Sequence, residues 1–405
     1  MAERPQLWTR SFVCICIANF MLFFAFYLLL PIIPLYLISE FHTSKSVVGM
    51  VLSCYTVAAL MVRPYSGFIL DKFKRKPIYL GAYLAFVFIF IGYAEAAFLS
   101  MFITLRILHG LAYGLVSTAG NTIVVDIMPS ERRGEGLGYF GVANNIAMAI
   151  GPMTSLFLVS HYSYNTIFYF SVGFGMIGFI IASTIKTPQK IRPKQLPEEQ
   201  PLHSYDRFLL VKGIPAGLCL LLLAVPYGIM SSFIAIYGQE IGITSGLGAF
   251  FSCMAVGLIS SRLFAGKQVD KGKLLKVIAI GNLITLLAFF WLSSLKIIAE
   301  YSTQLSTISY FSIAIALGVG YGCLFPAYNT LFVNLAPHNR RATASSTYLT
   351  SWDLGIGVGL LVGGTLADTQ GGLALSFFTG ACAATIAIIL FKQWAAPHFE
   401  RNKLR

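Results

Sequence analysis

The chain has 405 residues, of which 57% are of the hydrophobic types AVILMFWYC and only 11% are charged. A water-soluble domain carries charges on about a quarter of its residues, so this composition excludes one and indicates a protein whose solvent is lipid. The formal net charge of +13 is carried by short basic clusters between apolar runs, which favours membrane orientation over nucleic-acid binding. No nucleic-acid partner is therefore expected.

The apolar runs predict twelve transmembrane helices, each of about 20 residues or more. In chain order they cover residues 12–38, 46–70, 77–97, 99–125, 136–158, 165–185, 212–238, 244–266, 274–295, 304–333, 342–364 and 373–393. The seven cysteines all lie inside these runs without the spacing of a metal site. Neither a metal nor a cofactor is predicted.

Twelve crossings place both termini on the same side of the membrane. Of the 29 Lys and Arg residues, 24 fall in the N-terminal segment, in the loops after even-numbered spans, and in the C-terminal tail. Basic residues concentrate in cytoplasmic loops, so cytoplasmic termini and a plasma (inner) membrane location are expected. Residues 186–211 contain the longest polar stretch, with four prolines, and are predicted to form a cytoplasmic linker.

The two halves of the chain resemble one another. A shift of 208 residues places Tyr113–Gly136 on Tyr321–Ala344, with matching Tyr, Gly, Asn, Thr, Pro and paired Arg. A shift of 199 residues places Arg262, Gly266 and Asp270 on Arg63, Gly67 and Asp71. Repeated six-helix bundles are typical of alternating-access transporters, which predicts an N-terminal bundle over 1–185 and a C-terminal bundle with a short cytoplasmic tail over 212–405.

Three motifs resemble those of the major facilitator superfamily. RPYSGFILDKFKRK (63–76) resembles its cytoplasmic loop signature, although Lys74 stands where the family usually has Gly. RILHGLAYG (106–114) is similar to the helix 4 motif of proton-coupled members, with His109 replacing the usual Gln. GYFGVANNIAMAIGPMTS (138–155) resembles the helix 5 motif of antiporters, with Ala147 and Ser155 in place of two glycines. The resemblance implies the all-α major facilitator fold and a drug/proton antiporter-like branch, for multidrug or sugar efflux, which the Pro31 to Pro34 turn also fits.

The loop signature predicts a conformational latch at the cytoplasmic helix ends. A glycine there permits close helix approach, and a carboxylate at a helix end pairs with a cation or a helix N-terminus only when that side is closed. The alternative is that the basic residues only anchor the loop to anionic lipid. The residues assigned to the latch are Gly67, Asp71, Arg75, Lys76, Arg133, Gly266 and Asp270.

Charged residues inside spans mark functional sites, because burying a charge in lipid is costly. Asp353 is placed near mid-membrane in the eleventh span, and Arg106 lies within the fourth. A carboxylate that gains and loses a nearby cation can switch its protonation, so proton coupling is assigned to Asp353, with Arg106, His109 and Asp126 as partners or relays. The alternatives are a permanent ion pair of Asp353 with Arg63 or Arg106, and a packing role for His109.

Glycine and proline predict close or interrupted helix contacts. Gly151 and Pro152 interrupt the fifth span and are predicted to form a hinge, because proline removes a backbone donor. Gly355, Gly359 and the Gly363–Gly364 pair give the eleventh span a smooth face suited to close helix contact. Simple packing is the alternative for both features.

In the family that the motifs resemble, helices 1, 4, 7 and 10 line the central cavity. Aromatic rings with amides suit an amphipathic organic solute, although interhelical packing is an equal alternative for any one residue. The substrate-cavity candidates are Asn19, Tyr27, Tyr113, Asn121, Asn144, Asn145, Tyr227, Tyr237, Tyr321, Asn329 and Trp352.

These observations predict a monomeric secondary transporter, a proton-coupled exporter of small amphipathic organic molecules. Its partners would be a small-molecule substrate, protons and the lipid bilayer. A proton-coupled importer of a sugar or metabolite is the alternative within the same class. A nontransporting receptor or a membrane enzyme is less favoured, because the six His are scattered and no catalytic cluster is recognisable; no enzymatic activity is expected.

Overall fold

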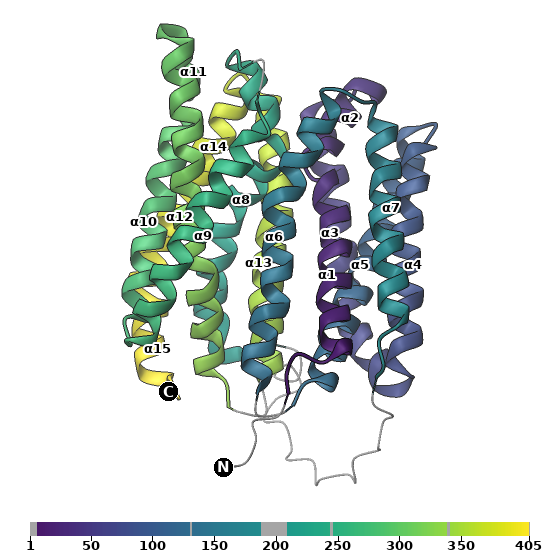
Figure 1. Ribbon diagram of the computed structural model, residues 1–405. Coiled ribbons are helices and arrows are strands. Elements are labelled where there is room, and N and C mark those ends of the chain that lie inside the picture. Colours follow the sequence, from purple (N-terminus) through teal and green to yellow (C-terminus); the bar gives the residue numbers. More distant parts are fainter. Residues whose placement is uncertain (1–5, 130–131, 188–208, 244–245, 338–340, 405) are drawn as a thin grey trace. The chain divides into compact units, whose positions relative to one another are not determined.

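The computed structural model describes residues 6–129, 132–187, 209–243, 246–337 and 341–404. Within these ranges all of the regular secondary structure is helical, with turns and short loops between the helices (Figure 1). Most of the predicted linker therefore lies outside the described residues. The helices are α1 Arg10–Leu29, α2 Ile32–Phe41, α3 Lys45–Lys72, α4 Arg75–Ala94, α5 Leu99–Ile127, α6 Arg133–Val159, α7 Tyr164–Ser183, η3 Val211–Gly213, α8 Ile214–Glu240, α9 Ala249–Asp270, α10 Leu274–Ser293, α11 Leu295–Tyr301, α12 Thr303–Leu335, α13 Arg341–Ala367, α14 Gly372–Leu390, η5 Phe391–Ala395 and α15 Ala396–Asn402.

Twelve of the described helices are long and apolar enough to cross a membrane. Each coincides with one of the twelve predicted spans, so the all-α membrane class is confirmed and the chain is a multi-pass membrane protein. The first predicted span consists of two helices, α1 and α2, that meet at Leu30–Pro31, at the start of the Pro31 to Pro34 turn. Pro31 has no N–H to continue the helix.

The chain forms two compact units. Unit 1 comprises Met1–Phe41 and Cys54–Leu196, and unit 2 comprises His42–Ser53 and Pro197–Arg405. The helix α3 therefore contributes its first nine residues to unit 2 and the rest to unit 1. This division of one helix is not visible in the hydropathy of the sequence.

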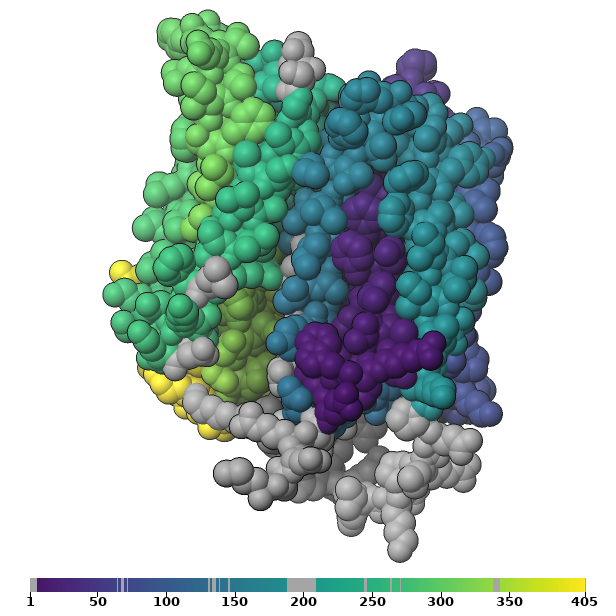
Figure 2. All heavy atoms as spheres, in the orientation of Figure 1, coloured from purple at the N-terminus to yellow at the C-terminus, as the bar shows by residue number. Residues whose placement is uncertain are grey.

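In unit 1, α1 packs between α6 and α7, as Figure 2 shows, and α4 packs against α5 and α7. Close approach depends on glycine. A Cβ on Gly114 of α5 would collide with Val62, and one on Gly110 would collide with the carbonyl oxygen of Tyr55, so α5 lies directly against α3. The core of this unit is rich in buried rings, including Tyr83, whose hydroxyl donates to the Ala18 carbonyl at 2.9 Å.

In unit 2, α8 packs against α13 and α14, while α12 packs against α9 and α10. The predicted glycine face of α13 is confirmed as a close-contact surface. A Cβ on Gly355 or Gly359 would collide with the carbonyl oxygens of Leu221 and Val225 on α8. A backbone oxygen cannot rotate away, so these helices approach as closely as only glycine permits.

Candidate functional site

The buried charge of unit 1 is Arg106, one helical turn from His109 on α5. Arg106 is 4% exposed and His109 is fully buried. The guanidinium carbon of Arg106 lies 4.4 Å from the ring centroid of Tyr55, and its charge also acts on Tyr93. The Tyr93 hydroxyl lies 2.9 Å from Nδ1 of His109. Tyr93 therefore lies near both basic side chains.

This cluster has unused hydrogen-bonding capacity. Nε and Nη1 of Arg106 and Nε2 of His109 have no hydrogen-bond partner among the described residues. The rings of Phe86 and Phe90 pack at 4.2 and 5.0 Å from the His109 ring. A buried polar atom without a partner is costly, so a hydrogen-bonding group placed at these nitrogens would be stabilising.

An aromatic stack lies one turn further along α5. The ring of Tyr113 stacks on Phe26 at 5.6 Å with an interplanar angle of 16°, and lies 5.4 Å from Tyr55. Tyr27 and Asn19 both come from α1, and Asn19 is buried. Of these aromatic residues, sequence reasoning found Tyr27 and Tyr113 but missed Tyr55, because nothing in its local sequence marks it as a partner of α5.

The remaining amide candidates of unit 1 differ in their surroundings. Asn121 is exposed, and its amide donates to the Ser117 carbonyl at 3.0 Å. Oδ1 of Asn144 is buried without a hydrogen-bond partner among the described residues. The side chain of Asn145 lies outside the described residues.

A second aromatic cluster is built in unit 2 by α8, α12 and α13. The Tyr227 ring lies 5.0 Å from Tyr321 and 4.9 Å from Trp352, and Phe325 lies 4.7 Å from Trp352. The hydroxyl of Tyr321 donates to the Leu223 carbonyl at 3.2 Å. The structure thus brings three predicted cavity residues together and adds Phe325, one turn after Tyr321, which helical spacing would have identified.

Asp353 follows Trp352 directly, about 18 Å along α13 from its first residue at 1.5 Å per residue. Tyr348 of the same helix interacts electrostatically with both Asp353 and Arg262 of α9. Nε of Arg262 is buried without a hydrogen-bond partner among the described residues. Arg262, which the sequence repeat aligns with Arg63, thus acts on the same tyrosine as Asp353.

At the opposite end of α3 from residues 42–53, Arg75 joins two helix ends of unit 1. Its guanidinium pairs with both carboxylate oxygens of Asp126 on α5 and donates to the Leu70 carbonyl at 3.3 Å. Lys76 donates to the Ser183 carbonyl at the end of α7 at 2.8 Å. Arg75 and Lys76, both assigned to the latch, thus make contacts with neighbouring helix ends of unit 1. Asp126, assigned to proton coupling, is the partner of Arg75. The side chains of Gly67, Asp71, Arg133 and Asp270 lie outside the described residues, and a Cβ on Gly266 would meet nothing within 4 Å.

Gly151 of α6 lies directly against α1. A Cβ there would stand 2.7 Å from Cβ of Tyr27 and 3.1 Å from its carbonyl carbon. The helix α6 continues through Pro152, and the Ser155 hydroxyl donates to the Pro152 carbonyl at 3.1 Å. The predicted hinge is thus a site of tight contact with the helix that carries Tyr27.

Three other features do not join these clusters. The Tyr237 hydroxyl bridges the Leu292 carbonyl at 3.3 Å and the Lys296 amide at 3.2 Å, which fixes the α10–α11 junction. Asn329 is exposed.

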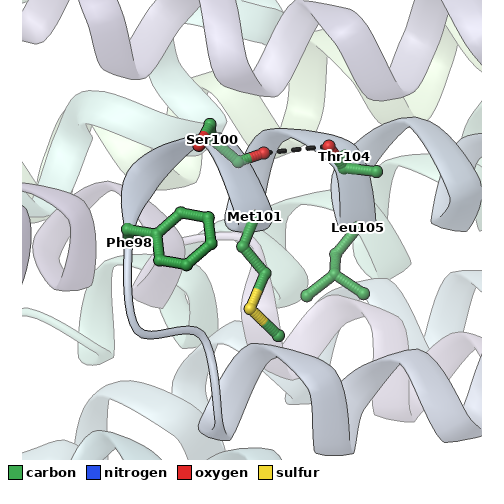
Figure 3. A pocket seen from close by; sticks show the side chains of 5 residues that line it. All are labelled: Phe98, Ser100, Met101, Thr104 and Leu105. Carbon is green, nitrogen blue, oxygen red and sulfur yellow. Dashed lines mark hydrogen bonds between the residues drawn. The ribbon is translucent and has the colours of Figure 1, made fainter.

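The hollow in Figure 3 is lined by Phe98, Ser100, Met101, Thr104 and Leu105, with a volume of about 330 Å³. It contains no titratable side chain, and the Thr104 hydroxyl is already bonded to the Ser100 carbonyl.

Comparison with known proteins relates the whole chain to transporters. A sequence model described as Major Facilitator Superfamily matches residues 15–360 and 306–404. The Staphylopine export protein of Staphylococcus aureus (strain Mu50) is 21% identical over 377 residues, which cover 88% of this chain and 90% of that protein. The Quinolone resistance protein NorA of the same strain is 23% identical over 389 residues, which cover 95% and 97%.

Solved structures share the fold at low identity. A variant of the nucleoside transporter NupG superposes with a TM-score of 0.76 at 15% identity, covering 94% of this chain and 99% of that chain. A D-xylose-proton symporter superposes with a TM-score of 0.77 at 14% identity, covering 98% and 99%.

Proposed function

Because this chain belongs to the major facilitator superfamily and is a transporter, we propose that it exports small amphipathic organic molecules in exchange for protons, by alternating access. The observation that carries the proposal is the similarity over nearly the whole chain to a staphylopine exporter and a quinolone resistance protein. The first name describes export of staphylopine, and the second describes resistance to a quinolone. Export is therefore favoured over sugar or metabolite import.

The substrate class follows from the side chains of the two clusters. Each unit presents packed aromatic rings near an ionisable residue of a membrane helix, Tyr113 near the buried Arg106 in unit 1 and Trp352 beside the half-buried Asp353 in unit 2. Rings bind apolar and aromatic surfaces, while a few polar groups orient the solute. A solute with a ring system and a charged or polar group would satisfy both.

Proton coupling is assigned to Asp353. A carboxylate in the middle of a membrane helix costs about 2.5–3.5 kcal/mol when charged, and a neighbouring cation offsets this cost. The proposed cation is Arg262 of α9, which acts electrostatically on Tyr348 as Asp353 does. A movement that changes the distance between Asp353 and its cation would change its affinity for a proton, which is the requirement for coupling. Arg106, with His109, is proposed as a second cation and relay in unit 1.

The proposed export is tested with cells that express the chain and are loaded with a fluorescent quinolone. The native chain should lower the intracellular signal, and a proton uncoupler should abolish the difference from cells carrying an empty vector. Equal retention with and without the chain would remove the quinolone as a substrate. Export that persists with the uncoupler present would remove proton coupling.

Asp71→Asn is expected to slow turnover severalfold while leaving the yield of folded protein unchanged. The reason is that Asp71 is proposed to make one charge-assisted contact that exists only when the cytoplasmic side is closed. The measurement is the transport rate at saturating substrate. A rate equal to that of the native chain would leave only lipid anchoring as the role of this loop.

The termini and residues 186–211 are proposed to face the cytoplasm of the plasma membrane. The 24 basic residues on that side motivate this orientation. A cysteine introduced as Ser204→Cys should resist a membrane-impermeant maleimide applied to intact cells and react after permeabilisation. The native chain, with its seven cysteines, is the control for background labelling. Ready labelling of Ser204→Cys from outside would reverse the topology.

A further inference from the structure

A group of buried polar side chains lies in the interior of unit 2, where α10 packs against α12. Asn282 and Thr285 come from α10 and Tyr328 comes from α12, and all three residues are 0% exposed. Nδ2 and Oδ1 of Asn282, Oγ1 of Thr285 and the hydroxyl of Tyr328 have no hydrogen-bond partner among the described residues. These three residues are called the α10–α12 polar cluster below.

Two contacts bring the members of the cluster into one region. The Asn282 amide acts on the Tyr328 hydroxyl, as does the thiol of Cys219 on α8. A Cβ on Gly320 of α12 would collide with Oγ1 of Thr285. Asn282 and Thr285 are three residues apart, so they share one face of α10. The unpartnered atoms therefore belong to a single polar region between the two helices.

The packing around the cluster is close because glycines face the neighbouring helix. A Cβ on Gly281 of α10 would stand 2.9 Å from Cγ of Leu324 and 3.1 Å from the carbonyl oxygen of Gly320, both on α12. The polar side chains are fully buried beside this contact. Neither bulk water nor a lipid headgroup reaches them while the helices stay together, so any further partner must be held inside unit 2.

Packing alone gives no reason for polar residues at these positions. A leucine, a valine and a phenylalanine would fill similar volumes without leaving a donor or an acceptor unpaired. Leaving a buried polar group without a partner costs more stability than an ordinary hydrogen bond contributes. Such groups in folded proteins are therefore bonded, in the large majority, to other protein atoms or to ordered water.

The chemistry of the unpartnered atoms indicates the class of ligand. An asparagine amide has two N–H donors and an acceptor, and the hydroxyls of Thr285 and Tyr328 can each donate and accept. Bound metal cations are usually held by carboxylate oxygens, whereas the groups that act on Tyr328 are an amide and a thiol. A small neutral molecule that both donates and accepts fits this set. Water is such a molecule, and a buried water makes about three hydrogen bonds.

We propose that the α10–α12 polar cluster binds a water molecule, which bridges the two helices inside unit 2. The water hydrogen bonds to the amide of Asn282 and to the hydroxyls of Thr285 and Tyr328, so it supplies the bonds that these groups do not make with one another. A bridging water is nearly as favourable as a direct hydrogen bond. The site joins helices of one unit, so the proposal depends neither on the solute that is transported nor on proton coupling.

Radiolytic labelling of the full chain in lipid nanodiscs tests the site, because X-rays turn a bound water into a hydroxyl radical that oxidises the adjacent side chain. Tyr328 should be oxidised severalfold faster than Tyr310. Tyr310 is the matched control, since it is on the same helix and is also 0% exposed, but its hydroxyl donates to the Ile234 carbonyl at 3.1 Å. Equal oxidation of the two tyrosines would overturn the proposal.

Thr285→Val distinguishes a bound water from bulk water that enters slowly. Valine keeps the shape of threonine but cannot hydrogen bond, so the bound water loses a partner and oxidation of Tyr328 should fall towards that of Tyr310. Ser306→Ala is the control variant, because the buried Ser306 hydroxyl is bonded to the Thr303 carbonyl at 2.9 Å, and it should leave Tyr328 oxidation unchanged. Undiminished oxidation in Thr285→Val would assign the label to bulk water and overturn the proposal.

A density map of the native chain decides the question without any substitution. In a map that resolves ordered water elsewhere inside the protein, a peak is expected within hydrogen-bond distance of Asn282, Thr285 and Tyr328. A map in which Asn282 bonds directly to Tyr328, with no such peak, would contradict the bound water.

Discussion

Replacing Asp353 by asparagine is expected to abolish uphill transport while leaving downhill exchange of substrate. Asparagine keeps the size and most hydrogen bonds of the side chain but cannot carry a proton. For a neutral solute, one exchanged proton and a pH difference of one unit sustain about a tenfold gradient, since one pKa unit is about 1.4 kcal/mol. In Asp353→Asn this gradient should fall to unity. The measurement is substrate accumulation in proteoliposomes under an imposed pH difference.

The matched control for this experiment is Glu300→Gln, which neutralises an exposed acid of unit 2 on α11. It should accumulate substrate as the native chain does. If Asp353→Asn also accumulates substrate against its gradient, Asp353 is a structural residue. His109, with its unpartnered Nε2, would then be the next candidate before Asp126, because Asp126 is already held by Arg75.

Gly359→Ala is expected to destabilise unit 2, whereas Gly266→Ala in the same unit should not. At Gly359 a Cβ would collide with the Val225 carbonyl oxygen and stand 2.9 Å from its carbonyl carbon, and backbone atoms of α8 cannot give way. Overpacking of this kind costs about 1–3 kcal/mol. At Gly266 a Cβ meets nothing within 4 Å, and alanine in a helix is favoured over glycine by up to about 1 kcal/mol.

Thermal unfolding in a single detergent measures both variants. Gly359→Ala should lower the midpoint by several degrees and reduce the yield of folded protein, and Gly266→Ala should match or slightly exceed the native chain. Equal midpoints for the two variants would mean that α8 and α13 tolerate a methyl group between them. The close contact would then not depend on glycine.

The membrane spans were predictable because each depends on local composition. A run of about 20 apolar residues must cross the bilayer whatever its neighbours are, and the described part of the chain contains twelve such helices. The glycine face of α13 was predictable for a similar reason, since four-residue spacing places small residues on one side of a helix. The break after Leu30 required a choice among several possible effects of Pro31 and Pro34, and composition alone does not make that choice.

The partners of the buried charges were less predictable, because they come from other helices. Arg106 was identified from its own position within a span, but Tyr55 on α3 and Tyr93 on α4 are placed beside it by tertiary packing. The electrostatic effect of Arg262 on Tyr348 likewise joins α9 to α13. Sequence spacing indicates which face a residue occupies on its own helix, and it contains no information on which helix lies opposite.

The same limit applies to the ends of α3. The basic cluster after this helix attracted the latch prediction, and the structure places Arg75 with Asp126 there. At the other end, Lys45 and Asp368 are ordinary loop-adjacent residues 323 positions apart. Only the folded chain brings the Asp368 carboxylate to the first N–H groups of α3.

Proton-driven export is tested most directly by reversing the driving force on the purified native chain. Proteoliposomes are loaded with a fluorescent quinolone at equal concentrations inside and outside, and a pH difference is imposed in either direction at zero membrane potential, with internal pH recorded. Net quinolone movement should run opposite to the proton flux, change direction when the pH difference is reversed, and vanish with an uncoupler. Quinolone movement in the same direction as protons would indicate a symporter. Movement that ignores the pH difference would contradict proton coupling altogether.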